Sequence, residues 1–175
     1  MSRRALLLLP LLAGCAGAAI PDPVRLPHDS VEGAGDPTRA AVSRAAFAFN
    51  QPGHFAGRPA EAARAIADME FLAAALPFDP RYQQRDPLLP VHLAQARAEW
   101  RSVLGIADAQ PAQPVIEALY AAARSGNAAL PAGIFASNAS ATLAALPPLP
   151  QTGRAAAAAA RVQSEGNNPA GRRRL

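Results

Sequence analysis

The chain contains no lysine, so all 17 of its basic side chains are arginines. This absence excludes enzymes that hold phosphates with a P-loop lysine and enzymes that form a Schiff base through a lysine amine. Cysteine occurs once, at position 15, which excludes an internal disulfide and every zinc or iron–sulfur site that needs several cysteines. Aromatic residues make up 5% of the chain and alanine supplies much of its 50% hydrophobic content, so we expect a core with few large side chains.

The positive charge of the chain lies mostly at its two ends. The formal net charge is +4, but Arg3, Arg4 and the cluster at 172–174 account for five of the arginines. Between these ends, twelve arginines meet 13 acidic residues, so the body is close to neutral. A near-neutral body gives no support for a nucleic-acid-binding surface, and we expect no nucleic-acid partner.

The N-terminus has the layout of a secretory signal. Two arginines, Arg3 and Arg4, precede the apolar run 5–13, which ends at small residues. Positive charge, apolar run and small residues in that order are typical of a secretory signal peptide. The apolar run has nine residues and contains Pro10, whereas a helix needs about 20 to cross a bilayer. We therefore expect a cleaved signal rather than a permanent membrane span.

The tetrapeptide Leu12-Ala13-Gly14-Cys15 resembles the lipobox of bacterial lipoproteins. The resemblance implies that residues 1–14 are removed as a signal peptide, and that acyl chains are attached to the sulfur and the new α-amino group of Cys15. It also implies the periplasmic face of the outer membrane rather than the inner membrane, because Ala16 stands where an aspartate commonly retains such proteins in the inner membrane. Two or more acyl chains anchor a protein stably. The alternative is a buried, inert cysteine in an ordinary N-terminal helix.

Helical periodicity and helix-boundary residues predict an all-α fold, an irregular bundle of about four to five helices within a domain at 36–150. Asp36 followed by proline is a typical start, and Gly105 a typical C-cap. Alternation of polar and apolar residues is not evident, so we predict no sheet. The expected helices are 37–50, 59–76, 87–104, 114–125 and a weaker one at 140–146. On the second of these, we expect Glu61, Arg64 and Asp68 to form exposed ion pairs.

Three segments flank this domain. Residues 15–35 contain the lipidated cysteine and a proline-rich stretch, which predicts a flexible tether with a reach of roughly 60 Å. Residues 151–165 are rich in alanine and favour a helix, but this helix has little to bury and frays unless it docks on the body. Residues 166–175 are expected to be a disordered basic tail.

The most polar interhelical segment is Arg81-Tyr82-Gln83-Gln84-Arg85, which we expect to be a loop. Two arginines beside a tyrosine can recognise an anionic group through forked hydrogen bonds. Arg81, Tyr82 and Arg85 are therefore candidate contacts for an anion or a protein partner. The alternative is a solvated loop without a ligand.

The histidines give weaker signals for chemistry. His28 falls in the expected tether and His54 in a loop, whereas His92 and Glu99 lie seven residues apart on one side of a helix. That spacing is not the i, i+4 pair of a helical metal site, so we expect no metal. Met69 falls on an apolar stripe where methionine usually fills space, and we expect no haem or other cofactor.

These patterns predict a lipid-anchored envelope protein that acts as a non-enzymatic scaffold or interaction module facing the periplasm. Its partners would be the membrane, through the acyl chains, and an envelope protein. The alternative is a small periplasmic enzyme or ligand-binding domain that uses His92, Glu99, Arg81 and Arg85. The enzyme alternative requires at least two of these side chains to line a common pocket.

Overall fold

The computed structural model describes residues 23–31, 35–51, 53–126 and 129–167. Over these residues the protein is helical and has no strand, which confirms the predicted all-α class. The α-helices are α1 (Pro37–Phe49), α2 (Pro59–Ala75), α3 (Pro80–Gln83), α4 (Leu89–Leu104), α5 (Ala112–Ser125), α6 (Ala139–Ala144) and α7 (Pro150–Asn167), and the 3-10 helices are η1 (His28–Ser30) and η2 (Leu76–Phe78).

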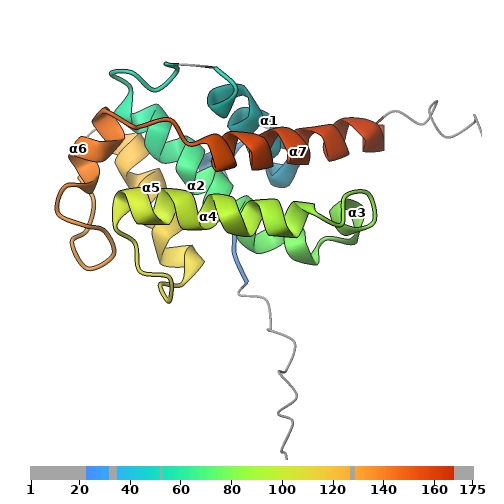
Figure 1. Cartoon of the computed structure of the whole chain (residues 1–175). Coiled ribbons are helices and arrows are strands. Elements are labelled where there is room, and N and C mark those ends of the chain that lie inside the picture. The colour runs from blue at the N-terminus through green and yellow to red at the C-terminus, as the bar shows by residue number, and fades with distance from the viewer. Residues whose placement is uncertain (1–22, 32–34, 52, 127–128, 168–175) are drawn as a thin grey trace, which may run out of the picture.

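Helix α2 lies at the centre of the bundle (Figure 1). It packs against α1, α4, α5 and α6, while α7 lies along α4 and α1. Because α2 has neighbours on several sides, its buried residues run almost without interruption from Ala62 to Leu72. The largest fully buried side chains of the core are Trp100, Arg101, Ile66, Met69, Leu72, Leu76, Leu89, Leu93, Leu104, Ile116, Leu119 and Leu143.

Local chemistry explains several helix boundaries. The Asp36 carboxylate accepts hydrogen bonds from the backbone N–H of Thr38 at 2.9 Å and caps α1 as predicted. Gly105 ends α4 in the left-handed conformation with φ of 63°, and a Cβ there would lie 2.4 Å from the Cβ of Ala136. Helix α4 begins two residues later than predicted, because the Asp86 side chain accepts from the N–H of Leu88 and holds 86–88 in a turn.

The alanine-rich segment docks on the body as α7 (Figure 1). Its small side chains let the backbone come close to its neighbours: a Cβ added at Gly153 would lie 3.3 Å from the carbonyl oxygen of Phe49. Residues 166–167, predicted to belong to a disordered tail, are the last residues of this helix. The rest of the predicted tail, 168–175, lies outside the described residues. The buried residues of α7 are Thr152, Ala155, Ala156, Ala158, Ala159 and Val162.

Residues 23–31 lie against the body, so the prediction of a free tether is wrong for this segment. Val24 and Leu26 pack on the core, and the N–H of Arg25 donates to the side-chain oxygen of Gln113 at 2.8 Å. Ser30 is buried. The predicted signal and lipobox, and the remainder of the tether at 15–22 and 32–34, lie outside the described residues.

Candidate functional site

Helix α2 carries two fully buried carboxylates, Asp68 and Glu70, that bind different neighbours. Asp68 accepts hydrogen bonds from Nε and Nη2 of Arg44 on α1, at 2.8 and 2.9 Å, and from the hydroxyl of Tyr120 on α5. Burial, together with the charge of Asp68, raises the pKa of the Tyr120 hydroxyl, so Tyr120 remains a donor. This cluster ties α1 and α5 to the central helix.

The Glu70 carboxylate binds donors from α4. Arg97 donates at 2.7 Å through Nη2, Trp100 donates at 2.8 Å through its indole N–H, and the Arg101 guanidinium donates as well. Arg101 also donates to three carbonyl oxygens in the segment 107–110 between α4 and α5. Burial alone would raise the pKa of Glu70, but its arginine partners outweigh burial and hold the pKa below its ordinary value.

The expected surface pairs on α2 are not present. Asp68 pairs with Arg44 rather than Arg64, because α1 and α5 cover this side of the helix. Arg64 instead donates to the carbonyl oxygen of Ser30 at 3.1 Å. Glu61 pairs with His54 at 3.1 Å and with Arg58 at 3.5 Å. The side of α2 that was expected to face solvent is therefore partly buried in the protein interior.

The segment Arg81–Arg85 is not the open loop that we expected, because Pro80–Gln83 form α3. Tyr82 is only 5% exposed, so its ring is not available beside the two arginines. Arg81 is exposed and pairs with Asp79 at 2.7 Å and with Asp36 at 3.8 Å. Arg85 donates to the carbonyl oxygen of Arg81 at 2.8 Å. The structure thus keeps two of the three candidates at the surface and buries the third.

Glu99 has a structural partner in α7. Its carboxylate accepts from the N–H of Gln151 at 3.2 Å, from the N–H of Thr152 at 2.8 Å and from the Thr152 hydroxyl at 2.7 Å. A carboxylate at this position satisfies the free amides of the first turn and complements the helix dipole. Glu99 therefore caps α7 from a neighbouring helix.

The four residues of the enzyme alternative do not share a cavity. None of three well-formed cavities among the described residues is lined by His92, Glu99, Arg81 or Arg85. The buried Nδ1 of His92 has no hydrogen-bond partner among the described residues. The requirement of a common pocket is therefore not met by these side chains in any of the three cavities.

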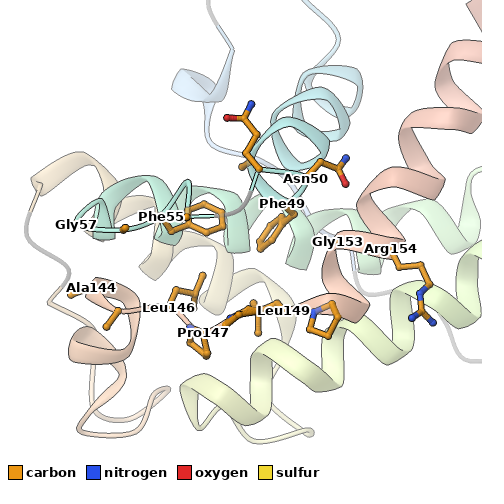
Figure 2. Close-up of a pocket in the computed structure, with 17 residues that line it drawn as sticks. Phe49, Asn50, Phe55, Gly57, Ala144, Leu146, Pro147, Leu149, Gly153 and Arg154 are labelled. Atoms are coloured by element: carbon orange, nitrogen blue, oxygen red, sulfur yellow. The ribbon is translucent and has the colours of Figure 1, made fainter.

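The largest of the three cavities is a groove of about 830 Å³, which we call the α1–α7 groove (Figure 2). Its walls come from the end of α1, from residues 50–51 and 53–57, and from the end of α6, the connection 145–149 and the first turn of α7. The rings of Phe49 and Phe55 meet edge to face with centroids 5.1 Å apart, and Leu146 and Leu149 lie opposite them (Figure 2). Its remaining lining residues are Ala48, Asn50, Gln51, Gly53, Ala56, Gly57, Ala144, Ala145, Pro147, Pro148, Pro150, Gly153 and Arg154.

One charged side chain, Arg154, borders this largely apolar groove. It is exposed and has no ion pair or side-chain hydrogen bond within the part of the chain that the structure describes. In Figure 2 its guanidinium extends from α7 away from the phenylalanine rings, at the edge of the cavity. The groove thus combines an apolar interior with one cation at its edge.

Sequence reasoning did not predict the α1–α7 groove. The predicted domain ends at Pro150, and the only prediction for His54 is a position in a loop. The usable signal was the pairing of two apolar, helix-breaking segments, but nothing local indicated that residues about 95 positions apart would meet.

Two smaller cavities, of about 220 and 210 Å³, are both lined by Arg64 and Glu61. The Nε atom of Arg64 is buried and has no partner among the described residues. Both acidic and basic side chains line these cavities, whose volumes lie below the usual range of ligand sites.

Over the described residues, no cluster of three or more His, Cys, Asp or Glu side chains is arranged to bind a metal ion. Among the same residues, the helices are too short or too polar to span a bilayer. Comparisons of the chain with protein-family models, with curated proteins and with solved structures find no match.

Proposed function

We propose that this chain is a lipid-anchored protein of the bacterial cell envelope whose helical body is a non-enzymatic binding module. The anchor is supported by the charged start, the short apolar run and the lipobox-like tetrapeptide ending in Cys15. The observation that carries the binding module is the α1–α7 groove of about 830 Å³, with its apolar lining and single charge.

The packing of residues 23–31 sets how far the body stands from its anchor. Seven residues separate Cys15 from Pro23, where the described chain begins. Fully extended, they span no more than about 30 Å. This is half of the roughly 60 Å expected for a tether that continues to Gly35. In this proposal the body works close to the membrane surface.

The size and lining of the groove support binding. Ligand sites of proteins typically occupy about 300–1,000 Å³ and are lined mostly by apolar side chains with a few polar groups that orient the ligand. The α1–α7 groove has this volume and this lining, with Arg154 as the orienting charge. Its walls offer apolar surface on which a bound molecule can pack, as the binding site of a scaffold or carrier protein does.

The anchor is tested by Cys15→Ser in the full chain, followed by separation of membranes from soluble envelope contents. We expect the variant to leave the membrane fraction, because the sulfur that accepts the diacylglycerol is lost. Unchanged membrane association would contradict the anchor.

The proposed outer-membrane location is tested by Ala16→Asp, which should move the protein to the inner membrane. The control variant Ala19→Asp adds the same charge three residues further along and should not change the location.

The module is tested by photocrosslinking in intact cells, with a benzoylphenylalanine in place of Phe55 in the groove. A matched probe replaces Phe78, which is 50% exposed and lies outside the groove. We expect a discrete adduct from position 55 that disappears in the Leu146→Arg background. Equal adducts from both positions, or an adduct from position 55 that survives Leu146→Arg, would contradict the groove as the binding surface.

A further inference from the structure

We infer that the α1–α7 groove binds the hydrocarbon chain of a single-chain anionic amphiphile, of the long-chain fatty-acid class, whose carboxylate lies at Arg154. The inference rests on the proposed function, in which this groove is the binding surface of the body. Three observations carry it: the chemistry of the groove walls, the position of the one charge, and the volume.

The walls suit hydrocarbon better than a peptide. Three of the six residues in the wall segment 145–150 are prolines, which have no N–H to donate. The polar side chains Asn50 and Gln51 lie only at the α1 end of the groove. A peptide backbone in this groove would find few N–H donors for its C=O groups, which is costly. An acyl chain has no such groups.

The two phenylalanines and the two leucines provide the contact surface. Phe49 and Phe55 form one wall, and Leu146 and Leu149 the other (Figure 2). Each methylene that such walls remove from water strengthens binding by about fourfold, so a long chain binds far more tightly than a short one. A volume of about 830 Å³ lies in the range of sites for ligands of this size.

Arg154 determines the sign of the head group. It is the only charged residue among those that line the groove, and within the described residues no carboxylate pairs with it. Its guanidinium extends outside the apolar interior (Figure 2). A carboxylate bound there keeps part of its hydration and accepts forked hydrogen bonds, while the chain lies in the groove. The arrangement is complementary to one negative charge at the end of one apolar chain.

The test uses the full chain, with its own anchor, in nanodiscs of phosphatidylcholine. The probe is a palmitate analogue that carries a diazirine near the end of its chain. We expect saturable labelling that maps to residues 48–57 and 144–154. Oleate should compete for this labelling, and methyl oleate, which lacks the charge, should compete at least about fivefold less well.

Two variants and two matched controls locate the site. Leu146→Arg places a charge in the groove and should lower labelling by about tenfold or more, whereas Val91→Arg makes the same change at an exposed position on α4 and should not. Arg154→Glu should lower labelling about fivefold, whereas Arg39→Glu, at an exposed position on α1, should not. Labelling that is unchanged in both groove variants, or that maps elsewhere, overturns the inference.

Failure of this inference is distinguishable from failure of the proposed function. If palmitate labelling is absent while the adduct from position 55 persists in cells, the groove binds something other than an acyl chain, and only the inference is overturned. If both are absent, the binding module is overturned with it.

Discussion

The indole Nε1 of Trp100 donates a hydrogen bond of 2.8 Å to the carboxylate of Glu70, and both side chains are fully buried. The same carboxylate neutralises Arg101, whose guanidinium also binds three carbonyl oxygens of the segment that leads to α5. One buried acid on α2 thereby holds α4 and the start of the α4–α5 connection. Buried ion pairs of this kind contribute less to net stability than their number suggests, but removing one partner is strongly destabilising.

Glu70→Gln should destabilise the protein strongly, by about 3–5 kcal/mol, because it leaves the buried Arg101 without its countercharge. Chemical denaturation followed by the fluorescence of Trp100, the only tryptophan, measures this loss. The control is Glu61→Gln, which changes a half-exposed carboxylate on the same helix and should cost less than about 1 kcal/mol. A loss in Glu70→Gln no larger than that of the control would contradict the assigned role.

Acid should unfold the protein partly through Glu70. Its pKa is lowered in the folded state, so its contribution to stability is complete above the unfolded pKa of about 4.3 and is lost as the pH falls through the folded pKa. The denaturation midpoint of the wild type should therefore fall steeply below about pH 4. Asp79→Asn, which removes a carboxylate whose pKa is also lowered but which lies near the surface, should leave most of this dependence intact. A denaturation midpoint that stays constant from pH 6 to pH 3 would contradict this role of Glu70.

High pH should destabilise the folded protein through Tyr120. Burial and the charge of Asp68 raise its pKa, so the hydroxyl contributes stability below the unfolded pKa of about 10, and this contribution is lost as the pH rises further. The pKa of Tyr82, the other tyrosine, is also raised, mainly by burial. Tyrosinate absorbance of the folded protein should therefore appear at higher pH than that of the unfolded chain. If the folded protein and the unfolded chain gave the same titration curve, the buried environment described for the two tyrosines would be contradicted.

The docking of α7 should depend on Glu99. Glu99→Ala removes the acceptor for the first-turn amides and the Thr152 hydroxyl, and the loss of such a cap costs about 0.5–2 kcal/mol. Hydrogen exchange of the α7 amides should accelerate more than that of α2. Glu117→Ala, which removes an exposed carboxylate from α5, is the matched control and should leave α7 unchanged. Equal exchange in both variants would mean that α7 is held by its alanines alone.

Local signals predicted the helical fold well. The Asp36-Pro37 start and the Gly105 cap depend on backbone groups a few residues away, and both appear where the sequence indicates them. The partner of Asp68 could not be predicted in this way, since Arg44 lies 24 residues earlier and on another helix. Two acids in the otherwise apolar run 65–76 were the available signal for buried ion pairs.

The α1–α7 groove and the docking of α7 depend on tertiary distances that periodicity does not encode. Alanine favours a helix in isolation as well as in contact, so composition does not distinguish a docked helix from a free one. The packing of α7 against α4 and α1, with the close approach of Gly153 to Phe49, shows which state the sequence adopts. The prediction of an open loop at 81–85 was wrong because α3 forms there and Tyr82 is buried, with a hydrogen bond to Gln163 of α7, 81 residues further along.

Mass spectrometry of the mature protein, extracted from membranes, tests the central claim most directly. The account predicts an N-terminal peptide that begins at Cys15, with a diacylglycerol on the sulfur and an acyl chain on the α-amino group, and no peptide from residues 1–14. A membrane-bound chain that still begins at Met1 and carries a free thiol at Cys15 would contradict it.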